Sequence, residues 1–575
     1  MALKSKLSKN QDSPMIDGYY IKKIGQNRGA PRVWLDRQTE RAGFEPGQRF
    51  DVVVQGKTIV LQANPDGSRI VSGKKEGDTT NPVIDINSRE LLALFDGMSS
   101  IRVAVQQGKI FLMPLASELK KQERFGRLRE KLEAGDPLAV GSLSHGGGVL
   151  SHAIHSGLKA SGVENRLAFA NEIREELLEH AAAHNDAWDE NTIAFAAPLQ
   201  ELAFDERGIA EIPKVEILEM GLPCSGESRA GKAKRGLEQG EAHPEVGHLV
   251  VGALVILSKT NPAAVVFEQV PTYATSASAN ILRNQLRDMG YVCHERLLRG
   301  SEWGALEDRV RWCMVAVSEG IEFDFDQLQP PGPSEKKIGD VLEAIPDDHP
   351  SWSNMAGLRA KELRDRAAGK NFAMQIFDAD SDHVGTLTKG YSKVRSTDPK
   401  LRHPSDPSLL RQFSPKEHAR IKGVPEHLVD GVSASVAHQI LGQGVVYPPF
   451  VGVGKHLGES LEAAGSGRRP ARRSDVIVKH DDAELSTELR IAALAAEVVA
   501  ELKKPNVESS TYFGRIVAAD KDVFIMDVGR QSGIVLERET LDRTPRLGEN
   551  IRILYRDGRA VVESQAKPVQ LALGL

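Results

Sequence analysis

The 575-residue sequence is poor in cysteine: it contains only Cys224, Cys293 and Cys313, and no Cys-x-x-Cys pair. This scarcity argues against a disulfide framework and against a zinc cluster, so we expect no metal site. Long apolar runs are also missing, and no stretch reaches the length of a membrane span. The start, Met-Ala-Leu-Lys-Ser-Lys, lacks the apolar core of a secretory signal. We therefore expect a protein of the cytoplasm that does not enter a membrane.

An excess of positive charge is missing as well. The 74 Lys and Arg residues are outnumbered by 79 Asp and Glu residues, which gives a net charge of −5. This balance excludes a uniformly basic nucleic-acid coat, so binding of that kind must come from local basic patches. The length exceeds what one hydrophobic core usually supports, and we expect three or four folded units.

Residues 18–112 contain an internal repeat with an offset of roughly fifty residues. Pro82-Val-Ile-Asp-Ile86 matches Pro31-Arg-Val-Trp-Leu35, and similar strand pairs follow each of them. One half is too small to bury a core alone, so we expect two halves to intertwine into one small barrel. The first half resembles the swapped-hairpin domains of the SymE and transition-state-regulator kind, which often bind DNA. A structural packing domain is an equal alternative.

The segment 221–236 combines a cysteine with several cations. An apolar run, 215–220, leads into Pro223-Cys224, so the thiol should lie at the mouth of a strand. Basic residues follow at once: Arg229, Lys232, Lys234 and Arg235. Because nearby cations favour a thiolate and attract phosphate, the segment predicts a nucleophile beside a polyanion site. A buried, inert cysteine is the alternative, and it is the commoner case for a lone Pro-Cys pair.

A second segment predicts a nucleotide-like ligand. Leu138 to Leu143 reads as a buried strand, the turn Ser144-His-Gly-Gly-Gly148 follows it, and a helix should extend from about residue 149 to 161. The next strand, 166–172, ends in Glu172, whose carboxylate could accept hydrogen bonds from ribose hydroxyls. Together these features indicate an adenosyl cofactor, although glycine turns of this kind are common.

Two further strand ends carry ionisable residues. Residues 263–267 read as a buried strand that ends at Glu268, and a carboxylate at a strand end can reach a pocket. A helix-capping or surface glutamate is the commoner role for any single Glu. Arg309 and Arg311 alternate on the approach to the strand 312–317, so both can face one side and offer hydrogen-bond donors.

The order of these motifs between about residues 138 and 457 resembles that of the DNA cytosine-5 methyltransferase family. Gly221-Leu-Pro-Cys224 is similar to the family's Pro-Cys nucleophile loop, and Glu268-Gln-Val270 is similar to its Glu-Asn-Val. Glu307-Asp-Arg-Val-Arg311 resembles Gln-x-Arg-x-Arg. The last two matches are Arg411-Gln-Phe-Ser-Pro-Lys-Glu-His-Ala-Arg-Ile-Lys-Gly-Val-Pro425 with Arg-x-Leu-Thr-x-x-Glu-x-x-Arg-x-Gln-Gly-Phe-Pro, and Gln439-Ile-Leu-Gly-Gln-Gly-Val-Val-Tyr-Pro-Pro449 with Gln-x-Gly-Asn-x-Val-x-Pro-Pro.

The resemblance implies roles for particular residues. Cys224 would attack carbon 6 of cytosine, Glu268 would protonate the ring, and Arg309 and Arg311 would hold the base. S-adenosylmethionine would contact a set of cofactor-binding residues: Leu143, Ser144, Gly146, Gly147, Gly148, Glu172, Pro223 and Gln443. Duplex DNA with a flipped-out base would contact a second set: Ser225, Arg229, Lys232, Lys234, Arg235, Thr386, Lys389, Lys393 and Arg395.

The sequence departs from the family pattern at several motif positions. The departures are His145 for Gly, Ser225 for Gln, Gln269 for Asn, Glu307 for Gln and Gln443 for Asn. The segment 185–202 should contain the acid that contacts the cofactor adenine, but no residue in it stands out. A catalytically inactive DNA-binding regulator and an RNA cytosine-5 methyltransferase of the same fold are therefore the alternatives.

The expected fold class is α/β: a doubly wound, Rossmann-like methyltransferase domain with a small target-recognition domain, and small β domains at both ends. The expected divisions are a disordered tail 1–17, the duplicated barrel 18–115, a catalytic domain 136–320, a target-recognition domain 321–430, a return segment 431–460, a basic linker 461–482, a helix 483–505 and a β domain 510–575. The last domain weakly resembles a part of KfrB-like plasmid proteins, which would suit a bacterial plasmid or phage origin. We expect a monomer, and a cognate restriction enzyme is left open as a partner.

Overall fold

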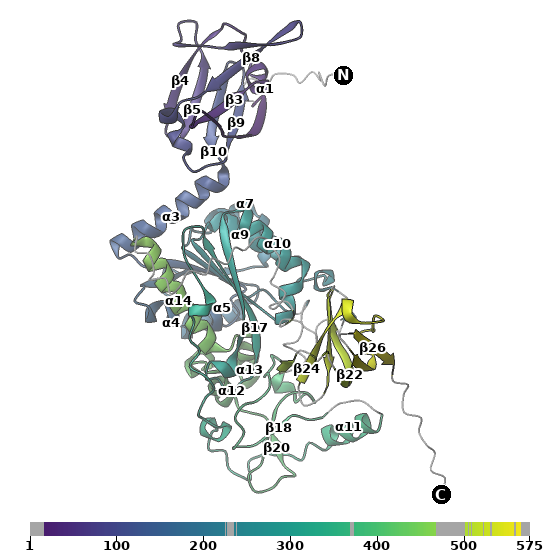
Figure 1. Ribbon diagram of the computed structural model, residues 1–575. Helices are drawn as coiled ribbons and strands as arrows, with labels where there is room; N and C mark the ends of the chain where they lie inside the picture. The colour runs from purple at the N-terminus through teal and green to yellow at the C-terminus, as the bar shows by residue number, and fades with distance from the viewer. Residues whose placement is uncertain are drawn as a thin grey trace. The chain divides into compact units, whose positions relative to one another are not determined.

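The computed structural model describes residues 16–224, 226, 235–236, 239–368, 373–466, 491, 501–503, 505, 507, 509–520, 522–528, 532–556 and 559–564 (Figure 1). The chain divides into two compact units, residues 1–123 and 124–575. None of the helices among these residues is both long and apolar enough to cross a bilayer. The expected tail 1–17 lies almost wholly outside the described residues.

The first unit contains two sheets built from the sequence repeat. Its elements are β1 (Gly18–Lys23), β2 (Gly25–Asn27), β3 (Ala30–Leu35), α1 (Arg37–Arg41), β4 (Arg49–Gln55), β5 (Thr58–Ala63), β6 (Arg69–Ile70), β7 (Ser72–Glu76), β8 (Thr79–Ile86), α2 (Arg89–Leu92), β9 (Ser100–Gln106) and β10 (Lys109–Pro114). The sheet orders are β1-β9-β10-β5-β4-β6 and β2-β3-β8-β7. Each repeat supplies a strand, a short helix and a hairpin, and the repeats pair through β3 with β8 and β5 with β10. One shared apolar core therefore serves both halves.

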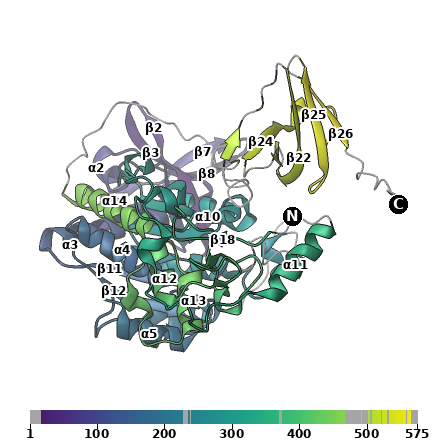
Figure 2. The same cartoon turned by 90° about the horizontal axis from the view of Figure 1, so that it is seen from below.

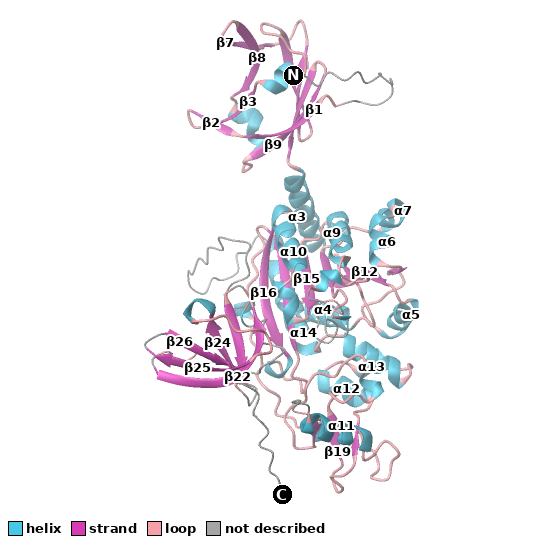
Figure 3. Ribbon diagram, turned by 90° about the vertical axis from the view of Figure 1, so that its right-hand side faces the viewer, coloured by secondary structure: helices cyan, strands magenta, loops and turns pink. Residues whose placement is uncertain are grey.

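The second unit is organised around a seven-stranded sheet (Figure 3). Its elements are α3 (Ala116–Ala134), β11 (Leu138–Leu143), α4 (Val149–Ala160), β12 (Asn165–Glu172), α5 (Glu175–His184), β13 (Ile193–Ala196), α6 (Leu199–Phe204), α7 (Glu206–Glu211), β14 (Ile217–Met220), α9 (Leu249–Thr260), β15 (Ala264–Gln269), α10 (Ala277–Asp288), β16 (Tyr291–Arg299) and β17 (Val310–Ser318). The strand order is β13-β12-β11-β14-β15-β17-β16, and β17 is antiparallel to both neighbours. The predicted doubly wound α/β class is confirmed.

Helices cover both faces of this sheet because its strands are apolar on both sides. One core contains residues of α4, α5 and the return helices α13 (Ala434–Gln443) and α14 (Tyr447–Gly465). The other contains residues of α6, α9 and α10. The end of α3 is fastened to the sheet, since Arg127 Nε donates to Glu216 Oε1 at 2.6 Å and Lys131 Nζ lies 2.7 Å from Glu216 Oε2.

A smaller region with its own core lies between β17 and α13. Its elements are α11 (Ala356–Ala367), β18 (Ile376–Phe377), β19 (Lys400–Arg402), β20 (Leu410–Arg411) and α12 (Pro415–Lys422). Tyr391 and Phe413 are fully buried in this core, and the Tyr391 hydroxyl donates to the Pro399 carbonyl at 2.7 Å. Figure 2 shows α11 at the edge of this region.

Six strands form the C-terminal sheet: β21 (Glu501–Lys503), β22 (Ser509–Ala519), β23 (Val523–Asp527), β24 (Ser532–Glu537), β25 (Asn550–Arg556) and β26 (Arg559–Ser564). The strand order is β21-β24-β23-β22-β25-β26. Two expectations differ from the structure here. Residues 501–503 are strand and not the end of a helix, because they pair in parallel with β24. The predicted linker at 461 begins later, because α14 continues to Gly465 and buries Leu461 in the core. The rest of the linker and of the predicted helix, apart from Ser466, Ile491, Pro505 and the residues just named, is outside the described residues.

Candidate active site

The site lies where the sheet order reverses. The chain leaves β11 toward β12 on one side and continues in β14 on the other, so the carboxyl ends of β11 and β14 open a crevice between their loops. Ligands of open α/β sheets bind at such a switch point. The glycine turn follows β11, Cys224 follows β14, and Glu268 is the second-last residue of β15.

Neighbouring strands present polar side chains to one face of the sheet at this point. Because side chains alternate along a strand, Glu219 shares the face of Ile217, and Glu268 shares the face of Val266. Ser142 on β11 faces the same way as Val140. All three residues are buried. The sheet therefore brings a hydroxyl and two carboxyl groups together beneath the Cys224 loop.

Glu268 forms the central ion pair of the site. Its Oε1 lies 2.9 Å from Nε of Arg311, and a Cβ placed on Gly221 would lie 3.5 Å from its Oε2. Burial raises the pKa of Glu268 above its usual range, although nearby cations, chiefly Arg311 and Arg309, oppose the shift. A raised pKa favours the protonated form of a carboxyl group, which can donate its proton to a bound ligand.

Arg309 is buried beside this pair. Its Nη1 donates to the Gly442 carbonyl at 3.0 Å, whereas its Nε has no hydrogen-bond partner among the described residues. Burial lowers the pKa of Arg309 to about 10, and the thiol of Cys224 lies near enough to contribute in the opposite direction. The guanidinium thus keeps one buried donor that no described residue satisfies.

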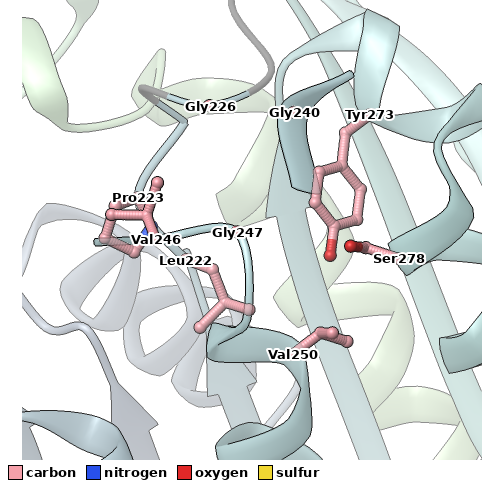
Figure 4. A pocket seen from close by; sticks show the side chains of 9 residues that line it. All are labelled: Leu222, Pro223, Gly226, Gly240, Val246, Gly247, Val250, Tyr273 and Ser278. Carbon is pink, nitrogen blue, oxygen red and sulfur yellow. The ribbon is translucent and has the colours of Figure 1, made fainter. Parts of the chain in front are cut away.

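Cys224 is exposed, and the loop that carries it is held from below. Gln269 Nε2 donates to the Leu222 carbonyl at 2.8 Å, and its Oε1 accepts from the Val270 amide at 2.6 Å. The Gln in place of the family's Asn therefore still braces the loop. Figure 4 shows the small pocket lined by Leu222 and Pro223 on one side and by Tyr273 and Ser278 on the other, where the hydroxyls of Tyr273 and Ser278 point toward each other.

The glycine turn has the close packing and the open backbone that a bound cofactor needs. Gly146 and Gly148 have φ of +57° and +77°, and a Cβ on Gly146 would meet nothing within 4 Å. A Cβ on Gly147 would lie 2.5 Å from Cγ2 of Ile440. Glu172 Oε2 accepts from the Gly146 amide at 2.9 Å, so this carboxylate also holds the turn against the end of β12. Leu143 is buried before the turn, and Ser144 has φ of +55°.

The segment 185–202, which is expected to contain the acid for the adenine ring, has no acid directly after β13. That strand ends at Ala196 and is followed by Ala197 and Pro198, and the carbonyls of Phe195 and Ala197 accept from Asn171 Nδ2 at 3.0 and 2.8 Å. The identity of the adenine contact stays a prediction for the segment 185–202. Gln443, another predicted cofactor residue, is exposed at the end of α13.

Glu219 is a site residue that sequence reasoning missed. Burial raises the pKa of its carboxyl group to about 8, the hydroxyls of Ser142 and Ser151 face it, and its Oε1 has no hydrogen-bond partner in the described part of the chain. The sequence did contain a sign of this role, since Glu219 stands inside an otherwise apolar strand. An unpaired acid rarely occupies such a position unless it has a function.

His145 connects to Glu219 through Ser142. Trp188 Nε1 donates to His145 Nε2 at 3.1 Å, so the ring proton of the neutral imidazole must be on Nδ1. That nitrogen lies 2.7 Å from Ser142 Oγ and donates to it, which leaves the Ser142 proton available to Glu219. Burial lowers the pKa of His145 to about 3, so the ring stays neutral. The histidine in place of a glycine is thus part of a hydrogen-bonded chain that reaches the site.

Glu307 and Lys422 form a fully buried ion pair with Nζ and Oε2 2.8 Å apart. Glu307 Oε1 also accepts from the Leu387 amide at 2.7 Å. This hydrogen bond ties the loop of residues 385–395, which we call the recognition loop, to the segment that leads into β17. Lys422 holds the pKa of Glu307 below its usual range, and burial lowers the pKa of Lys422 to about 7. Both residues stand where the family motifs have Gln.

The predicted DNA contacts divide into two groups. Ser225, Arg229, Lys232 and Lys234 lie outside the described residues. Arg235 is exposed, with Nη2 3.6 Å from Glu245 Oε1. Lys389, Lys393 and Arg395 are exposed on one loop, and Thr386 is half-buried beside them. A Cβ on Gly442 would lie 2.2 Å from the Lys389 amide nitrogen, so this loop begins against the end of α13.

A family model described as C-5 cytosine-specific DNA methylase matches residues 152–460, and a model of the KfrB domain matches residues 511–564. Type II methyltransferase M1.ScrFI of Lactococcus lactis subsp. cremoris is 27% identical over 262 residues, which are 44% of this chain and 64% of that protein. Type II methyltransferase M.NlaX of Neisseria lactamica is 28% identical over 261 residues, 44% of this chain and 80% of that protein. The match thus spans less than two thirds of the first relative.

The crystal structure of S. pombe Dnmt2 methyltransferase aligns with 57% of this chain and 99% of its own, at 20% identity and a TM-score of 0.44.

Proposed function

Because the chain belongs to the C-5 cytosine-specific DNA methylase family, we propose that it transfers a methyl group to carbon 5 of cytosine in duplex DNA. The observation that carries this proposal is the gathering of Cys224, Glu268, Arg309 and Arg311 at the ends of three adjacent strands, with Glu268 paired to Arg311. Each residue there has the chemistry that the reaction requires.

S-adenosylmethionine is the methyl donor of this family, and when bound it supplies an electrophilic methyl group on a sulfonium. The fit of the chain to this molecule is supported by the open backbone at Gly146 and by the tight packing behind Gly147 and Gly148. The proposed binding residues are those of the turn with its flanks: Leu143, Ser144, Gly146, Gly147, Gly148, Glu172, Pro223 and Gln443. Glu172 would bind while holding the turn, since it already accepts from the Gly146 amide.

Cytosine carbon 5 is too electron-poor to attack the methyl group unaided, so the proposed reaction is covalent. The Cys224 thiolate forms a bond to carbon 6, and Glu268 gives its proton to ring nitrogen 3, which makes carbon 5 an enamine nucleophile. Arg311, together with the open Nε donor of Arg309, holds the ring carbonyl oxygen. After carbon 5 takes the methyl group, a base removes the hydrogen of carbon 5 as a proton. The carbon–sulfur bond then breaks, nitrogen 3 gives its proton back to Glu268, and the thiolate returns.

The target base must leave the duplex stack to reach Cys224. We infer that the exposed cations of the recognition loop, Lys389, Lys393 and Arg395, and the basic segment after Cys224 hold the opened strand. The contacts of this loop with Glu307 and Gly442 support such a role, since they link DNA contacts to the catalytic residues.

We further propose that the protein acts as a monomer in the bacterial cytoplasm, with a cognate restriction enzyme as one partner to test. The support for a bacterial setting is the type II methyltransferase relatives, and the KfrB match would suit a plasmid or phage origin.

The test is expression in cells that lack cytosine methylation, followed by base-resolved methylation sequencing. Wild-type protein should methylate a defined duplex motif, and purified protein should form a covalent complex with duplex DNA containing 5-fluorocytosine. Cys224→Ala should abolish both results. Cys293→Ala is the matched control, because burial raises the pKa of that thiol to about 12 and leaves it unreactive. Transfer to tRNA without transfer to duplex DNA would favour the RNA alternative and contradict the proposal.

A further inference from the structure

Three metal-ligating side chains from separate segments meet beside the glycine turn. His152 lies in the first turns of α4, Asp186 follows α5, and His427 lies in the short helix η8 (Glu426–Val429). Nε2 of His152 and Nε2 of His427 lie 3.7 and 3.6 Å from the same oxygen, Oδ2 of Asp186. All three ligand atoms are within 4.8 Å of one another.

The spacing of these atoms suits a shared metal ion better than direct bonds between them. Tetrahedral zinc with bonds of about 2.0–2.1 Å places neighbouring ligand atoms roughly 3.3–3.5 Å apart. The two nitrogen–oxygen distances are slightly longer than this spacing and too long for hydrogen bonds. Small side-chain movements would bring all three atoms to bonding distance of one ion.

The surroundings orient the ligands. The Tyr447 hydroxyl donates to Ser156 Oγ at 2.8 Å and lies 2.7 Å from Nδ1 of His152. Nδ1 must therefore carry the ring proton, and Nε2 presents its lone pair toward Asp186. A hydrogen bond of this kind, from the far nitrogen of a histidine, is usual in metal sites. His152 is only 7% exposed, so its ring is held in place.

His427 supplies an independent observation. Its Nε2 is buried and has no hydrogen-bond partner among the described residues, although the side chain as a whole is 44% exposed. The rings of His152 and His427 are 5.6 Å apart. One divalent cation would satisfy both nitrogens and the carboxylate.

We propose that His152, Asp186 and His427 bind one divalent transition-metal ion of the zinc type, with water completing a tetrahedron. Such an ion would join α4, the loop after α5 and the segment that returns from the small region. It would also act close to the cofactor turn, because Asn185, the neighbour of Asp186, donates from Nδ2 to the Gly148 carbonyl at 3.0 Å. The inference does not depend on methyl transfer.

The experiment titrates full-length protein, first dialysed against a chelator, with Zn²⁺ in a calorimeter and with Co²⁺ in a spectrophotometer. Wild-type protein should bind one ion, give the intense visible bands of tetrahedral Co²⁺ and show a higher Tm with Zn²⁺. His427→Gln and Asp186→Asn should each weaken binding at least tenfold and remove the tetrahedral bands. Both positions are substantially exposed, so these variants should fold. His349→Gln, an exposed histidine outside the cluster, is the control and should bind as wild type does.

Two outcomes would overturn the proposal. One is a wild-type affinity no tighter than that of His427→Gln and Asp186→Asn. The other is a Co²⁺ spectrum with only the weak bands of octahedral, adventitious binding. Because these measurements need neither DNA nor cofactor, they are separate from the test of the proposed function.

Discussion

At the residue scale, two residues that depart from the family motifs contact each other. Glu307 and Lys422, which replace two Gln residues, meet as a buried ion pair 2.8 Å apart. A lone Glu or Lys at either position would be an unpaired buried charge, which costs several kcal/mol. The two substitutions therefore make physical sense only together.

We predict that Glu307→Gln and Lys422→Gln each lower the free energy of unfolding by about 3–5 kcal/mol, because each leaves one charge buried without its partner. The double variant should recover to within about 1 kcal/mol of wild type, since Gln pairs with Gln there. Chemical unfolding followed by tryptophan fluorescence measures this, since four of the five tryptophans lie between residues 188 and 352. Additive losses in the double variant would contradict the pairing.

A second prediction concerns Glu219, whose pKa is raised by burial to about 8 from an ordinary 4.5. Between these pH values the folded protein keeps a proton that the unfolded chain has lost, so stability falls as pH rises through the window. The slope from one such group is at most about 1.4 kcal/mol per pH unit. Glu219→Gln cannot titrate, so its unfolding free energy should match wild type near pH 5 and exceed it by pH 8.5.

The same unfolding series at four pH values measures this difference. Glu133→Gln is the control, because that side chain is exposed and should leave the slope unchanged. Parallel curves for wild type and Glu219→Gln would mean that the carboxyl group is ionised throughout.

At the element scale, the return helix α13 is pressed against both the glycine turn and the recognition loop. Gly147 has room for Ile440 only because it lacks a Cβ, and a Cβ on Gly444 would lie 3.0 Å from Val149. Gly442 likewise leaves room for the backbone of Lys389 because it lacks a Cβ, and its carbonyl accepts a hydrogen bond from Arg309. One helix end therefore sets the positions of the cofactor turn, the DNA-contacting loop and a catalytic arginine.

We predict that Gly147→Ala reduces cofactor affinity at least tenfold, because the new Cβ would lie 2.5 Å from Ile440 and displace the turn or α13. Adding Ile440→Ala removes the clashing atoms and should restore part of the affinity. Calorimetric titration with S-adenosylmethionine is the measurement. Gly126→Ala, in the helix α3 with nothing within 4 Å of its new Cβ, should bind the cofactor as wild type does.

At the scale of the whole molecule, the family match at 152–460 does not include the first unit. That unit has its own core, and α3 is fastened to the catalytic sheet through Arg127 and Lys131, so a cut before α3 should leave both parts folded. Its first half is basic, with Lys22, Lys23, Arg28, Arg32 and Arg37. Arg32 is paired with Asp85 at 2.8 Å, and Lys22 lies 3.6 Å from Asp36, which reduces the charge presented to DNA.

We predict that deleting residues 1–115 leaves the methylated motif unchanged but weakens DNA binding and makes it less sensitive to salt, because fewer counterions are released. DNA-binding titrations between roughly 50 and 200 mM salt measure the affinity and its salt dependence, because counterion release has a large effect over this range. Methylation sequencing identifies the motif. A changed motif would mean that the unit reads sequence. Unchanged affinity and salt dependence would mean that it has only a structural packing role.

The sequence alone determined the fold class and the family, because each motif is short and keeps its own residue types: Pro223-Cys224, Glu268, and the two arginines before β17. It also revealed the repeat in the first unit, since the matching segments recur at an offset of roughly fifty residues. These features can be read from neighbouring residues along the chain, so recognising them requires no knowledge of which residues are buried.

Only the tertiary structure decided which distant residues are partners. Glu307 and Lys422 are 115 residues apart, and His152 and His427 are farther still, so no spacing rule could join them. The sequence did not show which groups surround Glu219. In the folded sheet, the alternation of side chains directs it toward Ser142 and Glu268 and away from water. The reason is physical: the pKa of a carboxyl group and the ligands of a metal ion depend on burial and on neighbours in space, and both arise only when the sheet and its helices pack.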